Sequence, residues 1–218
     1  MKPSPRPHSR LPALLALTLA LLASACSLVG GGKTSPTRYD PAPRVQADPA
    51  WPTASGSLTV VMPSIDAALD DTRIAVSPTA GELQVYRAAE WVRHPAGMVE
   101  DAVLRTLEDS GKLAAVVRQG SGIATDYRLL LDVRRFQADY AGQPVPAAVL
   151  EVNATLVATS GQGVIASRNF RVSQPAAGTT VAQVVDAFAG ALATLGHDIS
   201  GWALQAAPRT TPAASPKR

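Results

Sequence analysis

The sequence contains few cysteines and histidines, and each shortage excludes a class of protein. Cys26 is the single cysteine in 218 residues, so the chain forms no intramolecular disulfide and is not a disulfide scaffold. The histidines are His8, His94 and His197. A zinc site needs three or four converging ligands, and a Ser-His-Asp site needs a base beside its nucleophile. We therefore expect no enzyme, no metal and no cofactor. Acid pairs such as Glu100 with Asp101 are expected to be solvated.

The part of the chain expected to fold also lacks an excess of positive charge. The whole sequence has 20 Lys and Arg against 17 Asp and Glu, but Lys2, Arg6 and Arg10 fall in an N-terminal leader. Residues 58–204 carry 11 basic and 15 acidic side chains. A nucleic-acid-binding domain needs a concentrated positive face to neutralise phosphates. Nucleic acid is therefore excluded as a partner.

The leader, residues 1–25, has the pattern of a secretory signal. Its head is basic without any acid, residues 11–23 are almost wholly apolar, and Ala23, Ser24 and Ala25 are small. The apolar run is shorter than the roughly 20 residues of a spanning helix. A buried N-terminal helix is the alternative interpretation.

The residues Ala23-Ser24-Ala25-Cys26 resemble the lipobox of bacterial lipoproteins. In those proteins the cysteine receives a diacylglycerol and an N-acyl chain and becomes the first residue. Here Ala23 stands where leucine is usual, and ordinary signal peptidase could also cut after Ala25. Lipidation of Cys26 is the favoured interpretation. Ser27 in place of aspartate implies, by the same resemblance, an outer-membrane lipoprotein that faces the periplasm.

Composition divides the mature chain into three parts. Residues 26–57, rich in Pro, Gly, Ser and Ala, are predicted to be the lipidated N-terminus and a flexible tether. Residues 205–218 are predicted to be a disordered tail. The segment between them, 58–204, is predicted to be one domain. Trp51 lies in the predicted tether, either exposed or loosely docked.

Within the domain the apolar spacing alternates between strand and helix periods. One helix is expected from Pro95 to a stop at Gly111, and a second begins at Thr180 with capping-box spacing. Gly190 and Gly196 lie off the apolar stripe of the second helix. Strands are expected at 58–62, 73–76, 81–87, 113–117, 127–134, 149–157 and 164–172, the last two as a hairpin. This order predicts a two-layer α+β fold, with two helices on one face of a mixed, mostly antiparallel sheet.

From about Leu58 to Trp202 the chain resembles the ABC-type transport auxiliary lipoprotein family. The resemblance rests on LTVVMPSIDAALDDTRIAV, LQVYRAAEWVRHPAGMVEDAVLRTLEDSG and DYRLLLDVRRF, followed by the hairpin and the long helix. It implies an accessory of an MCE-type (mammalian cell entry type) transporter that moves phospholipids or other hydrophobic molecules between membranes. An MCE-domain protein is the implied partner, and a homo-oligomer is possible by the same resemblance.

A surface for that partner is expected near the entry to the first helix, at Tyr86, Arg87, Trp91 and Arg93, because aromatic residues and arginine are enriched in interface hot spots. The alternative for Trp91 is that it closes the core. Two rival functions stay open. One is a lipoprotein regulator or assembly factor for cell-envelope enzymes, and the other is an enzyme of unknown type.

Overall fold

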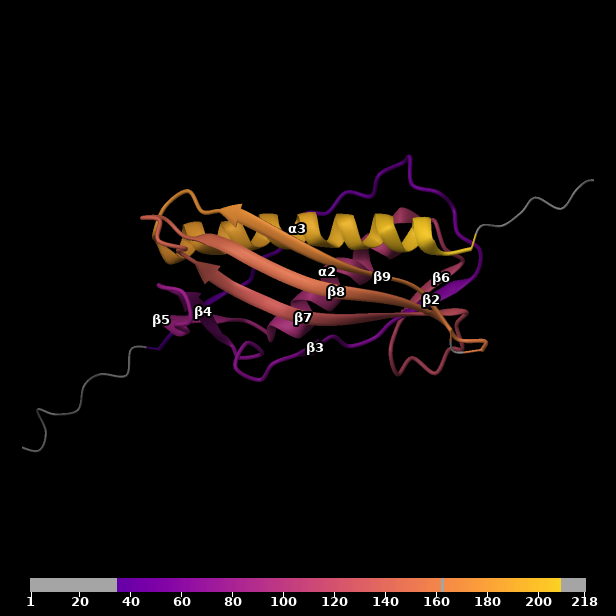
Figure 1. Cartoon of the computed structure of the whole chain (residues 1–218), viewed down its shortest axis with the longest axis horizontal. Coiled ribbons are helices and arrows are strands. Elements are labelled where there is room, and N and C mark those ends of the chain that lie inside the picture. The colour runs from indigo at the N-terminus through magenta and orange to yellow at the C-terminus, as the bar shows by residue number, and fades with distance from the viewer. Residues whose placement is uncertain (1–34, 162, 209–218) are drawn as a thin grey trace, which may run out of the picture. The chain divides into compact units, whose positions relative to one another are not determined.

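The computed structural model describes residues 35–161 and 163–208 (Figure 1). Cys26, the predicted signal and most of the predicted tail lie outside these residues. The compact unit of the chain begins at Pro36. The described residues form two helices and nine strands, in an α+β fold as predicted. In chain order these are β1 (Thr37–Tyr39), β2 (Ser57–Val60), β3 (Ser64–Ile65), β4 (Arg73–Ser77), β5 (Gln84–Trp91), α2 (Pro95–Ser110), β6 (Ala115–Arg118), β7 (Tyr127–Asp139), β8 (Ala147–Ala158), β9 (Val164–Pro175) and α3 (Val181–Ala206).

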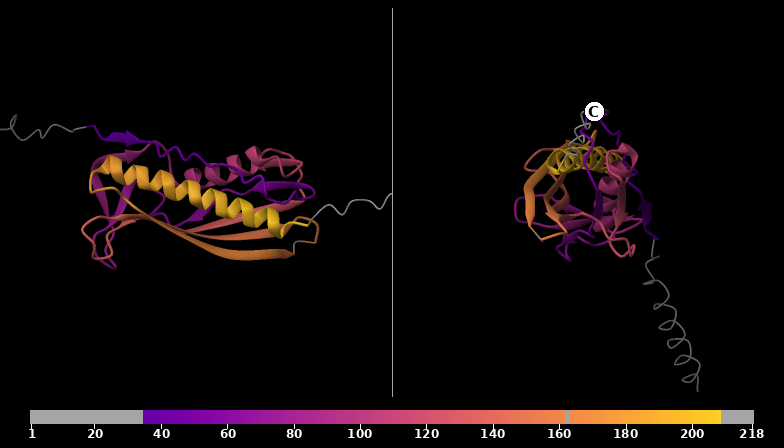
Figure 2. Two further views of the ribbon diagram at one scale, coloured as in Figure 1. Left: turned by 90° about the horizontal axis from the view of Figure 1, so that it is seen from above. Right: turned by 90° about the vertical axis from the view of Figure 1, so that its right-hand side faces the viewer.

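The centre of the sheet is the long strand β7. On one side β7, β8 and β9 form two long antiparallel pairings, which confirms the predicted hairpin. On the other side β7 pairs in parallel with β2, β3 and β4 along successive parts of its length. The sheet is therefore mixed, and most of its paired residues are antiparallel. It curves around the two helices, which lie side by side on one face (Figure 2).

Buried and exposed side chains alternate along the long strands, so that one face of each strand is turned toward the helices. Leu129, Leu131 and Val133 of β7 are buried, whereas Arg128 and Leu130 between them are exposed. Leu150, Val152, Ala154 and Leu156 of β8 are fully buried, as predicted. Burial of this apolar area is the main favourable term for the fold.

Both helix starts and one helix stop confirm the capping predictions. Pro95 opens α2, and Gly111 ends it in the left-handed conformation with φ 61°. Thr180 and Gln183 form a complete capping box at the start of α3. The interpretation of Gly196 was wrong, however. It is buried where α3 crosses α2, and a Cβ added there would lie 2.8 Å from the carbonyl oxygen of Ala102.

The predicted tether was too long at its C-terminal end. Residues 37–39 form β1, which pairs with β5. We call residues 40–56 the strap, because they lie against the α2 and α3 helices (Figure 2). Within the strap Trp51 is only 6% exposed, with its ring 4.8 Å from that of His197. Burial of one large aromatic side chain holds in place a segment whose overall composition is typical of a linker.

Hydrogen bonds hold the end of the strap to the residues just beyond the C-terminal ends of both helices. The backbone N–H of Ala54 donates to the carbonyl of Lys112 at 2.9 Å, and Lys112 Nζ donates to the carbonyl of Pro49 at 3.1 Å. The Ser55 N–H donates to the carbonyl of Pro208 at 3.0 Å, just beyond α3. Ala207 is buried as well, so the domain extends past residue 204, where its end was predicted.

Candidate partner-binding site

The four residues predicted to bind a partner belong to β5 and the turn after it. β5 is irregular there. Its pairing with β4 shifts between Ala75 opposite Val85 and Arg73 opposite Glu90, so β5 advances five residues while β4 advances two. Ala88 within this bulge has φ 51°, in the left-handed region that is costly for a residue with a Cβ. The bulge sends neighbouring side chains of β5 in different directions.

Trp91 is a core residue and is unavailable to a partner. It is 1% exposed, and its ring makes edge contacts with Phe188 at 5.0 Å and Phe136 at 6.1 Å between ring centroids. The prediction of Trp91 as a partner contact was therefore wrong. Trp91 instead joins the sheet to α3, because Phe136 comes from β7 and Phe188 from α3.

Tyr86 and Arg87 lie at the other end of β5 from Arg93. Tyr86 is half-buried with a buried hydroxyl, and burial raises the pKa of Tyr86, with a further increase from Tyr140. Arg87 is exposed. Arg93 is half-buried beyond the end of the strand. The four predicted residues thus do not form one continuous surface.

Arg93 belongs to an ion-pair network that joins the strap, the turn after β5, α2 and β6. Its guanidinium donates to Asp101 and, at 3.2 Å, to Asp40. Arg118 at the end of β6 donates to both Glu100 and Asp101. The hydrogen bond to Asp101 raises the pKa of Arg118, and the charge of Glu100 adds to this effect. The network fixes the start of the strap to the first turns of α2.

The expectation that Glu100 and Asp101 are solvated was wrong. Glu100 is 3% exposed, and a buried carboxylate needs a charged or hydrogen-bonding partner. Arg118 supplies that partner to both acids at once. Nothing in the spacing along the chain marks Arg118 or Asp40, because strand order alone brings them to α2.

An open cleft with a volume of about 420 Å³ lies between the strap and α2. Its floor includes the buried side chains Met98 and Ala102, and prolines of the strap line another part. Charged groups of both signs line the cleft. These are Arg44, Arg93, Arg105, Asp40, Asp101 and Asp109, and we call this surface the arginine cleft. An apolar floor beside several arginines has the composition of a protein interface.

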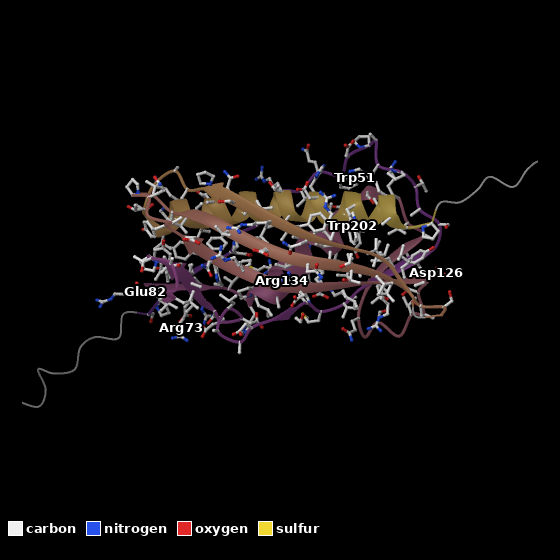
Figure 3. All side chains as sticks on the ribbon, viewed as in Figure 1. Trp51, Arg73, Glu82, Asp126, Arg134 and Trp202 are labelled. Carbon is white, nitrogen blue, oxygen red and sulfur yellow. The ribbon has the colours of Figure 1, made fainter. Side chains whose placement is uncertain are left out.

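Within residues 35–161 and 163–208, neither helix combines the length and the apolar character needed to cross a membrane. Within the same ranges no group of three or more His, Cys, Asp or Glu residues is placed to hold a metal ion. Figure 3 shows instead that polar side chains are spread over the outer face of the sheet, as at Arg134.

Comparison with known proteins gives one family. The family described as ABC-type transport auxiliary lipoprotein component matches residues 39–200. The crystal structure of protein XCC0632 from Xanthomonas campestris is 48% identical, with a TM-score of 0.74, and the alignment covers 78% of this chain and 96% of that one. A second crystal structure, of an uncharacterized protein, has a TM-score of 0.57 at 13% identity over 76% of this chain and 97% of that one, and shows the fold alone.

Among curated proteins, uncharacterized protein bll6063 of Bradyrhizobium diazoefficiens is 27% identical over 187 residues. The alignment covers 85% of this chain but 50% of that protein. The chain therefore spans about half the length of the curated relative that it matches.

Proposed function

Because the chain belongs to the ABC-type transport auxiliary lipoprotein family, we propose that it is a non-enzymatic accessory of an MCE-type transporter, anchored in the outer membrane and facing the periplasm. The cargo would be phospholipid or another hydrophobic molecule, and the role would be to dock or assemble the MCE-domain protein at that membrane. The observation that carries this proposal is the family match over residues 39–200, which covers the strap and nearly all of the α+β unit.

The proposed anchor is a diacylglycerol and an N-acyl chain on Cys26. One acyl chain holds a protein to a membrane only reversibly, whereas two or more hold it stably. The support for this anchor is the sequence of small residues that ends at the chain's single cysteine. Anchoring also raises the effective concentration of the domain near a partner without adding any contact.

The arginine cleft is the proposed docking surface for the MCE-domain protein. Arg93 is the one residue of the predicted set that lies on it, and the strap adds the exposed Arg44. Arg44 extends from a segment fixed by Trp51 and by the Arg93–Asp40 ion pair, so it is presented on an ordered backbone. A preorganised surface loses less entropy on binding than a flexible one.

The test is copurification of the MCE-domain protein with tagged full-length chain, measured as an affinity in detergent. Arg44→Glu should weaken binding about tenfold or more, as expected for an interface hot spot. Arg128→Glu is the matched control, because Arg128 is also an exposed arginine but lies on the outer face of β7. It should leave the affinity unchanged.

Two results would contradict the proposal. If the wild-type chain, correctly folded and acylated, retains no MCE-domain protein, the role as its docking component is wrong. If Arg44→Glu and Arg128→Glu bind equally well, the role can stand but the arginine cleft is not the docking surface.

A strain lacking the protein should also become sensitive to detergents, with resistance restored by the wild-type gene.

A further inference from the structure

The chain enters the folded unit at a defined place. β1 runs parallel to β5, with Thr37 opposite Ala89 and Tyr39 opposite Trp91. Traced backward from Thr37, the direction of β1 points toward the end of β5 that begins with Gln84. The first residue of β1 therefore lies on the side of the start of β5.

Little chain separates that entry point from Cys26. Ten residues, 27–36, lie between Cys26 and β1. Whatever conformation they take, a chain step spans at most about 3.6 Å, which limits the distance from Cys26 to Thr37 to about 40 Å. A tether up to residue 57 would have allowed roughly 110 Å by the same limit. The pairing of β1 with β5 thus holds the unit much closer to the proposed anchor.

Exposed apolar side chains lie at the same end of the sheet. Leu83 is 45% exposed, Val85 42% and Val145 37%. The strand register brings them together. Gln84 pairs with Val76, Val76 with Ala138 and Ala138 with Ala148, which places the loop of Val145 and the start of β5 at one end. We call Leu83, Val85, Val145 and the exposed Arg87 the apolar end.

We propose that the apolar end rests on the phospholipid surface of the membrane that holds Cys26. This inference rests on the proposed lipid anchor and goes beyond the transport role. Leu83, Val85 and Val145 would enter the boundary between headgroups and acyl chains, while the Arg87 guanidinium would bind lipid phosphate. Each contact is weak, but the covalent anchor keeps the surface within reach of the lipid.

Exposure alone does not select this end of the molecule. At the opposite end Ile123 is 57% exposed and Val164 66%. Figure 3 places the two ends apart, with Glu82, next to Leu83, at one and Asp126, near Ile123, at the other. The place where β1 begins, together with the limit of about 40 Å on the distance from Cys26 to Thr37, favours the apolar end as the membrane contact.

The experiment uses the acylated full chain, purified from membranes and reconstituted in vesicles of phosphatidylethanolamine and phosphatidylglycerol. An acylated Cys26 has no free thiol, so Leu83→Cys and Val164→Cys each introduce the single reactive one. Each is labelled with an environment-sensitive fluorophore, and quenching by spin-labelled lipids is measured. Val145→Cys repeats the measurement in a loop if Leu83→Cys does not fold.

The expected result is a blue shift with lipid quenching at positions 83 and 145, and neither at position 164. Equal quenching at both ends, or quenching at 164 alone, overturns the orientation while the anchor stands. A blue shift without lipid quenching also overturns it, because protein and not lipid then covers the surface. A second labelled thiol per molecule means that Cys26 is not acylated, which removes the anchor and this inference together. Copurification with the MCE-domain protein in detergent tests the transport role separately.

Discussion

A single Cβ added to α3 should have opposite effects on stability at two glycines. At Gly190 the nearest atom to an added Cβ is Cγ of Gln174, at 3.4 Å, which belongs to a flexible side chain. At Gly196 the nearest atom is the carbonyl oxygen of Ala102 on α2, at 2.8 Å, and this backbone atom cannot rotate away. Both positions lie inside the same helix, so Gly→Ala gives the same gain in helix propensity at each.

The magnitudes follow from those contacts. Replacing a helical glycine by alanine stabilises by about 1 kcal/mol when nothing opposes the Cβ. Gly190→Ala should therefore raise the free energy of unfolding by about 0.5–1 kcal/mol. Forcing an extra methyl group into a close-packed contact costs about 1–3 kcal/mol, so Gly196→Ala should be destabilising by up to about 2 kcal/mol overall.

The assay is urea and thermal unfolding of the two variants beside the wild type. One kcal/mol corresponds to about 2–4 °C in Tm for a domain of this size, so the two variants should separate by several degrees on opposite sides of the wild type. Thr106→Ala should not rescue Gly196→Ala, because Thr106 Oγ1 lies farther from the added Cβ, at 3.3 Å, than the backbone oxygen does. Equal Tm values for the two glycine variants would refute the proposed close crossing of α2 and α3.

Four further changes test other parts of the fold. Trp51→Ala should cost about 3 kcal/mol by urea unfolding and expose the strap to limited proteolysis, and an uncleaved strap would contradict its attachment by Trp51. Ala88→Gly relieves a positive φ and should leave thermal stability unchanged or raise it by up to about 1 kcal/mol, whereas a clear loss would argue against the bulge. The hydrogen bond from Arg73 lowers the pKa of Asp71 from 3.8 to about 2, so its stabilising effect is complete above about pH 4 and is lost as the pH falls through 2. Asp71→Asn should therefore lower the unfolding midpoint slightly at pH 7 and not at pH 2, since the pair is largely exposed; equal shifts at both pH values would contradict this pairing. Cys26→Ala should release the protein from the membrane fraction, and unchanged fractionation would contradict the anchor.

The elements that the sequence predicted well are those in which apolar period and burial agree. Leu129, Leu131 and Val133 alternate with exposed residues in β7, and the capping box at Thr180 marks the start of α3. Such local patterns need no knowledge of the rest of the fold. The domain boundary was predicted less well, because Trp51 stands among Pro, Ala and Asp residues that dominate the composition of the strap. Its burial depends on a partner surface formed almost 150 residues later, by His197 and Gly201.

Two of the residues predicted to bind a partner, Trp91 and Arg93, have different roles in the structure, and this difference also depends on long-range packing. Aromatic residues and arginine are frequent both in interfaces and at the edges of cores, so composition at Trp91 and Arg93 does not separate the two roles. The separation comes from α3. Phe188 covers Trp91, whereas no side chain of α3 lines the arginine cleft around Arg93.

The same long-range packing links the strap to the proposed place of the protein on the membrane. If residues 26–57 acted as one flexible linker, the domain could sample every orientation relative to the membrane. The apolar end would then face the lipid no more often than any other surface. The pairing of β1 with β5 leaves ten residues between Cys26 and the first strand, and β1 begins on the side of the start of β5. Trp51→Ala alone should lengthen the reach very little, because β1 would still pair with β5. Loss of lipid quenching at position 83 should therefore require disruption of β1, for example by Arg38→Pro, which removes a backbone N–H and its freedom of φ within that strand. If Trp51→Ala abolishes the quenching while Arg38→Pro preserves it, β1 does not set the orientation.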